Sequence, residues 1–267
     1  MDKKVHSIML QLVDDMVADG LTHFTFDDAV QRLGRSPSAT ANVLRRMAIH
    51  GLVDRVRRGN YVIRKLGVLG TRAASENLSI VVASTFSGHS HRIAYGSALD
   101  EHDLIAHPVR TIYVASTRRM RVKSLSGRPL RTVAEPEEAI RIGAAAHGLS
   151  WISDLERALL DAAARPDLVG GAAVLAEALA AAGRKINPDN LTEYARQLGW
   201  NAALRRIGSM SDALAVEGLA GKLAPLKPPV SDLDLEPGSG MSTAWRDSRW
   251  RVRWAQPLDE LANVVRQ

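Results

Sequence analysis

A short basic segment, residues 35–65, carries the side chains of this chain that are best suited to bind a polyanion. It holds eight cations and one acid, whereas the whole chain of 267 residues has a formal net charge of +6. The remainder is therefore close to neutral, and a localised excess of positive charge points to a polyanion partner. Hydroxyl, amide and guanidinium groups recur in this segment, and such groups can donate hydrogen bonds to phosphate oxygens and to base edges.

A helix must position these groups. Ser36 is a good N-cap and Pro37 suits the first helical position, so we expect a helix from there to about His50, with Gly51 as its stop. One face of this helix carries small and apolar side chains, namely Ala41, Leu44, Met47 and Ala48. The opposite face carries Ser38, Asn42, Arg45 and Arg46. This division predicts a core contact on one side and leaves the other side free for a ligand.

The residues before this helix predict two more helices. Apolar side chains at spacings of three and four residues favour a first helix over residues 5–16. Thr25 or Asp27 can then cap a short second helix, which Gly34 closes.

The residues after it predict a hairpin. Two strand-like runs, 52–57 and 60–65, are separated by Arg58 and Gly59, with Asn60 able to share the turn. Three helices followed by a hairpin with arginines at its tip are typical of a winged helix-turn-helix. In that geometry the third helix enters the major groove and the wing lies along the DNA backbone.

The expected DNA contacts follow from the position of each group. Bidentate hydrogen bonds to base edges are expected from Asn42, Arg45 and Arg46, each good pair giving about 1–3 kcal/mol of discrimination. Contacts to phosphates are expected near the helix N-terminus and from the wing, namely from Arg35, Ser36, Ser38, Thr40, Arg57, Arg58, Gly59 and Asn60. The alternative is a small helical domain with a solvated basic face. The cap, the hairpin and the confined charge together favour DNA binding.

The rest of the chain predicts a larger α+β domain. Small residues and glycines at 66–76 suggest a linker, which gives domains at 1–66 and 75–267. The runs 78–83, 109–114 and 120–125 favour strands, and a helix is expected to begin near Arg92. Helical patterns follow from Ser150 onward, at 155–164, 172–182, 188–198 and 201–215. Strands first and helices later favour an α+β domain over a doubly wound sheet.

The C-terminal end alternates apolar and basic residues. Trp250, Val252 and Trp254 share one face of a predicted final strand, opposite three arginines. The Trp side chains could stack on bases, but their period of two favours the core. Pro257 then opens a short closing helix.

The segment 154–171 resembles a known family. It reads Asp-Leu-Glu-Arg-Ala-Leu-Leu-Asp, then a Pro, then a Gly pair. This is similar to the AbiEi antitoxin family of type IV toxin–antitoxin (abortive infection) systems, in which Thr is common where Ala158 stands. Supporting matches lie at 97–99, 190–195 and 203–208, and the likeness covers about residues 5–215. The charged residues Glu156, Arg157 and Asp161 lie at helical spacing, which favours structural ion pairs over catalysis.

The resemblance implies a double role for the chain. The winged helix would repress the protein's own operon by binding double-stranded operator DNA, with inverted repeats, and the second domain would neutralise a nucleotidyltransferase-like toxin protein. A second basic surface would then meet DNA or an acidic partner, or be a solvated face. It comprises Arg118, Arg119, Arg121, Lys123, Arg128 and Arg131. The alternatives are a protein-binding antitoxin or scaffold, and a stand-alone transcription regulator without a toxin partner.

The sequence lacks the motifs of several other classes of protein. The chain has no Cys, which excludes disulfides and thiolate metal sites. His89, His91, His102 and His107 match no standard metal spacing, and no phosphate loop, dinucleotide fingerprint or nucleophile elbow occurs, so we expect no enzyme, no cofactor and no metal. Short apolar runs predict no membrane span, and the acidic N-terminal stretch predicts no secretory signal. A cytoplasmic protein that joins the nucleoid when bound to DNA is expected.

Overall fold

The computed structural model of the protein describes residues 3–57, 59–63, 71–125, 128–237 and 243–265. Contacts along the chain divide it into two units. The first comprises Met1–Gly88, Ser124–Arg128 and Gly148–Ser150, and the second comprises His89–Lys123, Pro129–His147 and Trp151–Gln267. Both units combine helices with strands, so the protein belongs to the α+β class, as the sequence predicts.

The first unit contains the helices and the hairpin expected near the N-terminus. Its elements are α1 (Lys3–Ala18), β1 (His23–Thr25), α2 (Phe26–Leu33), α3 (Pro37–Ile49), β2 (Val53–Arg57), β3 (Asn60–Ile63) and α4 (Thr71–Thr85). Thr25 caps α2 through a reciprocal pair of hydrogen bonds with Asp28, and Gly34 ends that helix with a φ of 58°. Ser36 caps α3 and Pro37 occupies its first turn. These caps confirm the helix boundaries predicted from the sequence.

A small antiparallel sheet closes this unit. Its strand order is β1-β3-β2, so the short strand β1 pairs with β3 on the side opposite to β2. The hairpin β2–β3 has an irregular register between Arg55 and Arg57. Phe24 and Tyr61 stack across the β1–β3 pair with ring centroids 5.4 Å apart.

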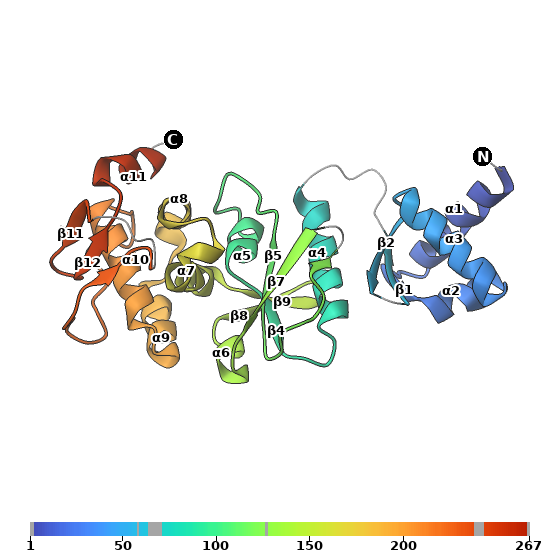
Figure 1. The fold of residues 1–267 in the computed structure, drawn as a ribbon, viewed down its shortest axis with the longest axis horizontal. Helices are drawn as coiled ribbons and strands as arrows, with labels where there is room; N and C mark the ends of the chain where they lie inside the picture. The colour runs from blue at the N-terminus through green and yellow to red at the C-terminus, as the bar shows by residue number, and fades with distance from the viewer. Residues whose placement is uncertain (1–2, 58, 64–70, 126–127, 238–242, 266–267) are drawn as a thin grey trace. The chain divides into compact units, whose positions relative to one another are not determined.

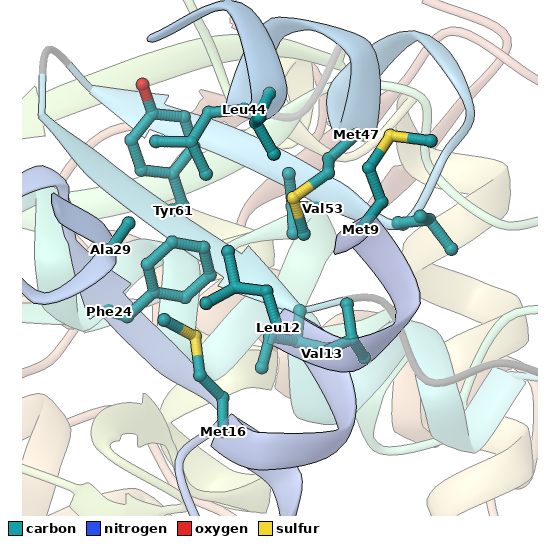
Figure 2. Packing of buried hydrophobic residues seen from close by; sticks show 13 residues of the cluster. Met9, Leu12, Val13, Met16, Phe24, Ala29, Leu44, Met47, Val53 and Tyr61 are labelled. Atoms are coloured by element: carbon teal, nitrogen blue, oxygen red, sulfur yellow. The ribbon is translucent and has the colours of Figure 1, made fainter. Parts of the chain in front are cut away.

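The core of the first unit lies between this sheet and the helices. Figure 2 shows side chains from α1, α3 and the sheet converging on it. The buried residues are Met9, Leu12, Val13, Met16, Phe24, Ala29, Val43, Leu44, Met47, Leu52, Val53, Tyr61 and Ile63. Unbranched Met side chains fill gaps that a chain with few aromatic residues would otherwise leave. The core fixes which face of α3 points inward.

The helix α4 corrects two expectations. Residues 71–76 begin this helix rather than forming a linker, and 78–83 are helical rather than a strand. Leu78, Val81, Val82 and Thr85 are buried, at the spacings of three and four residues that belong to a helix face. The β-branched composition suggested a strand, but burial follows the helical period. The predicted domain boundary at residue 66 lies outside the described residues.

The main sheet belongs mostly to the second unit and has the order β6-β7-β5-β4-β9-β8. Its strands are β4 (His91–Ile93), β5 (Ile112–Ser116), β6 (Ser124–Leu125), β7 (Arg128–Ala134), β8 (Ala144–His147) and β9 (Ser150–Ser153). It is mixed, because β4 and β5 run antiparallel while β5–β7 and β4–β9 run parallel. Two short helices accompany it, α5 (Gly96–Glu101) and α6 (Glu137–Arg141).

The helix expected to begin near Arg92 starts four residues later. Arg92 lies in β4, and Tyr95, with a φ of 54°, separates this strand from α5. A positive φ breaks both regular conformations, so the chain turns there. The predicted strand at 109–114 is shifted to β5, and only the last two residues of 120–125 form a strand.

The helical half of the second unit follows the sequence closely. Its elements are α7 (Leu155–Ala164), η1 (Pro166–Leu168), α8 (Ala172–Ala182), η2 (Gly183–Lys185), α9 (Pro188–Leu198), α10 (Asn201–Ala213) and α11 (Leu258–Val265). A small sheet of order β10-β12-β11 combines β10 (Leu233–Asp234), β11 (Trp245–Asp247) and β12 (Val252–Trp254). Figure 1 shows α7 to α10 between the main sheet and this small sheet. Trp250, Val252 and Trp254 are fully buried, which confirms their predicted core role.

Candidate nucleic-acid interface

The exposed face of α3 carries most of the predicted base-reading side chains. Ser38, Asn42 and Arg45 form one stripe along the helix, with Arg46 beside it, and all four are exposed. No described side chain forms an ion pair with Arg45 or Arg46. Guanidinium and amide groups in this position can make bidentate hydrogen bonds, because no partner within the described chain occupies them.

The N-terminal end of α3 adds short polar groups. The Ser36 Oγ accepts a hydrogen bond from the Ala39 N–H at 3.4 Å and lies 3.3 Å from the Ser38 Oγ. Arg35 is exposed just before this cap. Backbone N–H groups of the first helical turn point toward this end, and the helix dipole favours an anion there. The end of the helix therefore offers donors for phosphate oxygens.

The burial of Thr40 contradicts the prediction that its side chain contacts phosphate. Thr40 is fully buried, and its Oγ1 has no hydrogen-bond partner among the described residues. The buried face of α3 passes through Thr40, Val43, Leu44 and Met47, which are spaced by three and four residues. Leu44 and Met47 were correctly placed in the core. The remaining two residues of the predicted apolar face, Ala41 and Ala48, are exposed. The helix is thus rotated relative to the expectation, because alanine carries too little apolar area to anchor a face.

The turn of the hairpin is fixed by its backbone. Gly59 has a φ of 80°, which only glycine adopts without strain, and its carbonyl oxygen accepts the Phe26 N–H at 2.7 Å. This bond ties the hairpin to the start of α2. Asn60 begins β3 and is half-buried. The backbone of Arg57 lies in β2, while its side chain and the whole of Arg58 lie outside the described structure.

An exposed apolar residue on the same stripe was missed by the sequence analysis. Ile49 is 72% exposed and lies four residues after Arg45 and seven after Asn42. These spacings place it on the face of α3 that carries the polar groups. The helical spacing was the signal that could have found it. An apolar side chain here is suited to contact a thymine methyl group.

The second basic surface lies on the main sheet and the loop beside it. Arg118, Arg119, Arg121 and Lys123 are exposed between β5 and β6. On β7, Arg128 is half-buried and Arg131 is exposed. Arg131 lies 3.6 Å from the Asp167 carboxylate. The set therefore occupies a loop and a strand face.

The C-terminal arginines have acidic partners. Arg251 lies 2.8 Å from Asp232, Arg253 lies 2.7 Å from Asp234, and Arg249 pairs with Asp212 at 2.6 Å. Only Arg253 lies on β12, because the strand begins at Val252 and Arg251, with a φ of 52°, belongs to the turn before it. The three arginines are thus paired with acids of the second unit, unlike Arg45 and Arg46 on the exposed face of α3.

A buried charge network surrounds the segment that carries the family resemblance. The Asp161 carboxylate accepts hydrogen bonds from Arg92 at 2.9 Å and from Arg157 at 2.8 Å, and all three side chains are fully buried. Glu135 bonds both arginines and accepts the Tyr95 hydroxyl at 2.8 Å. Burial alone would raise the pKa of Asp161, but Arg157 and Arg92 outweigh it and hold that pKa below its usual value. The ion pair of Arg157 and Asp161 expected from helical spacing is confirmed.

A comparison with solved structures finds a likeness over nearly the whole chain. The chain is similar in fold to the RV2827C protein from Mycobacterium tuberculosis. The TM-score is 0.67 at 16% sequence identity, over 98% of this chain and 95% of that chain. No known family and no curated protein matches the sequence. At this level of identity the likeness shows that the two chains share a fold.

The imidazole groups noted in the sequence do not gather into a metal site. His91 bonds the carbonyl oxygen of His89 at 2.9 Å, and His102 bonds that of Ser153 at 2.7 Å. Within residues 3–57, 59–63, 71–125, 128–237 and 243–265, no three His, Asp or Glu side chains could hold a metal ion. Across the same residues, no helix is long and apolar enough to cross a bilayer.

Proposed function

We propose that the protein is a sequence-specific double-stranded DNA-binding protein, and that residues 3–63 form its winged helix-turn-helix. The observation that carries the proposal is the face of α3, where Asn42, Arg45 and Arg46 stand exposed with no ion pair to a described side chain. The element order α1-β1-α2-α3-β2-β3 supports it, because a winged helix has this order. The exposed stripe would lie in the major groove.

Each part of the unit has a role in this arrangement. Asn42 would read adenine, and Arg45 and Arg46 would read guanine, through bidentate hydrogen bonds. Arg35, Ser36 and Ser38 would bind phosphates and fix the register of the helix. The hairpin turn at Gly59, with Arg57 and Arg58, would follow the backbone as the wing. Ile49 would add an apolar contact at the far end of the stripe.

Selection of binding sites from a randomised duplex library tests this role. The full chain is expected to enrich one short site and to bind it more tightly than a scrambled duplex of equal length. Arg46→Ala should weaken binding to the enriched site by about 1–3 kcal/mol. The matched control is Arg184→Ala, an exposed residue of the second unit that pairs with Glu217 and removes the same charge. An unenriched library, or equal losses in both variants, would contradict the proposal.

We further propose that the protein represses its own operon and acts as an antitoxin. This part rests on the resemblance of segment 154–171 to the AbiEi family. The buried network of Arg157 and Asp161 gives the segment a structural reason to retain its charged residues, so the segment supports a shared fold rather than a reacting centre. The toxin contact would then lie on exposed residues of the second unit.

Co-expression with the product of the adjacent gene separates the antitoxin from a stand-alone regulator. We expect the full chain to restore growth to cells that express that product. Arg46→Ala should keep this rescue while weakening operator binding, because the two roles use different residues. If the unaltered chain does not rescue growth, the antitoxin role is wrong, and the alternative of a transcription regulator without a toxin partner is favoured. Rescue without any DNA binding by the unaltered chain would favour the protein-binding alternative.

A further inference from the structure

A small pocket lined by three arginines lies within the second unit. It has a volume of about 260 Å³, and its lining residues are Arg119, Arg131, Thr132, Val133 and Arg165. They come from three places in the fold: the loop after β5, the strand β7 and the end of α7. Only two of these arginines belong to the basic surface predicted from the sequence, because Arg165 is distant along the chain.

The charge of the pocket is only partly neutralised. Arg165 donates two hydrogen bonds to the Asp167 carboxylate, both at 2.8 Å, and Arg131 lies 3.6 Å from the same group. Arg119 has no ion pair with any described side chain. Three guanidinium groups and one carboxylate leave an excess of two positive charges. Asp167 also restrains two of the arginines, which lowers the entropy lost when they bind an anion.

One residue that lines the pocket carries a buried polar group without a partner among the described residues. The Oγ1 of Thr132 is buried and forms no hydrogen bond with a described group. A buried hydroxyl without a partner costs free energy, so such groups in a folded protein call for an explanation. Thr132 lies between Arg131 and Val133 on β7 and lines the same pocket. The Oγ1 is closed off from the cavity in this structure, so an anion bound among the arginines would accept its O–H after the Thr132 side chain rotates toward the pocket.

We propose that this pocket binds the phosphate group of a small phosphate monoester. A monoester carries about −1.5 to −2 charges at neutral pH, which matches the excess in the pocket. A phosphodiester carries only one charge, so it would neutralise only half of the excess in this partly open pocket. Sites for drug-sized ligands measure about 300–1,000 Å³, so this pocket has room for a phosphate group and a few further atoms. Val133 offers an apolar contact to the carbon atoms of the ester.

Calorimetric titration of the full chain with glycerol phosphate and with inorganic phosphate tests the proposal. Saturable binding of both is expected, with dimethyl phosphate, a diester, binding much more weakly. Affinity should fall below about pH 6, where the monoester takes up a proton. Absence of saturable binding, or equal binding of the diester, would overturn the proposal.

Two pairs of variants assign the binding to the pocket. Arg119→Gln should weaken phosphate binding by about tenfold or more, whereas its exposed neighbour Arg118→Gln, which does not line the pocket, should leave binding unchanged. Thr132→Val keeps the side-chain shape, so it should weaken binding without lowering the melting temperature. Equal effects of Arg118→Gln and Arg119→Gln would overturn the assignment.

The site is independent of the proposed DNA contact on α3. Arg46→Ala should bind phosphate as the unaltered chain does, even if it no longer binds a selected duplex. If duplex DNA displaces glycerol phosphate from the unaltered chain, the pocket belongs to a nucleic-acid surface and the small-ligand proposal is wrong.

Discussion

At the scale of single residues, the arginines divide by what their guanidinium groups bind. Arg92 and Arg157 are buried on carboxylates. Arg206 is buried and donates hydrogen bonds to the backbone carbonyl oxygens of Asp234 and Ala163, and this burial lowers its pKa to about 10. An unpaired buried charge is costly, so these side chains are committed to the fold. Arg45 on α3 is exposed, with no ion pair to a described side chain, and is free to bind a ligand.

Thr40 provides a test of which α3 residues face DNA. Because its hydroxyl is buried without a partner in the described part of the chain, Thr40→Val should leave the free energy of unfolding unchanged or raise it by up to about 1 kcal/mol. DNA affinity should not change, whereas Ser38→Ala on the exposed face should lower it. Urea unfolding and DNA titration of both variants measure this. A marked loss of DNA affinity in Thr40→Val would restore the rejected phosphate contact.

Asp161 should dominate the acid stability of the second unit. Asp161→Asn leaves two arginines with a neutral partner and should lower the free energy of unfolding by about 3–5 kcal/mol at neutral pH. The exposed control Asp167→Asn should cost only about 0–1 kcal/mol.

The pH dependence follows from the direction of the Asp161 pKa shift. Its folded pKa is lowered, so the ionised carboxylate stabilises the fold fully above its usual pKa of 3.8, and this contribution is lost as the pH falls through the folded value. The stability difference between Asp161→Asn and the unaltered chain should therefore shrink below about pH 4. A difference that grows on acidification would contradict this assignment.

At the scale of elements, boundaries were predictable where a cap or a breaker fixes them. The helices α7, α8 and α9 match the sequence prediction to the residue. Asp154 caps the start of α7 and Asn187 that of α9, and Gly183 and Gly199 end α8 and α9. The prediction of the buried face of α3 was right for its large side chains, Leu44 and Met47, and wrong for Ala41 and Ala48. The sequence missed β7, β8 and β9, whose short alternating runs depend on pairing with distant strands.

Gly208 on α10 tests close packing between elements. A Cβ at this position would overlap the indole ring of Trp250. Gly208→Ala should therefore lower the free energy of unfolding by about 1–3 kcal/mol, despite the better helix propensity of alanine. In the double variant with Trp250→Phe, the free energy of unfolding should fall by less than the sum of the two single decreases, because the smaller ring leaves space for the added methyl group. Strict additivity in thermal or urea unfolding would contradict this contact.

At the scale of the whole molecule, the fold is shared with RV2827C while the charge is local. The whole chain has a net charge of +6, and the segment 35–65 alone carries eight cations and one acid. The α+β class and the order of the three N-terminal helices and the hairpin could be predicted from caps and periodicity, whereas the short strand β1 could not. The three-arginine pocket could not, because Arg119, Arg131 and Arg165 meet only when the sheet and α7 are assembled.

The salt dependence of DNA binding reports the number of phosphate contacts. The logarithm of affinity should fall linearly with the logarithm of salt concentration, by about 0.9 for each phosphate contact. Arg58→Ala removes a predicted wing contact, so the slope should become shallower by about one contact and affinity should fall alike on all duplexes. Arg184→Ala should keep the slope of the unaltered chain. An unchanged slope in Arg58→Ala would remove the wing from the interface.

The most direct test of the central claim is an affinity profile over all single-base variants of the selected duplex. With the unaltered chain, substitutions under α3 should each cost about 1–3 kcal/mol. With Arg46→Ala, the profile should flatten at one or two base pairs and keep its shape elsewhere. The same loss on every duplex, with the profile unchanged, would mean that α3 does not read bases and would contradict the account.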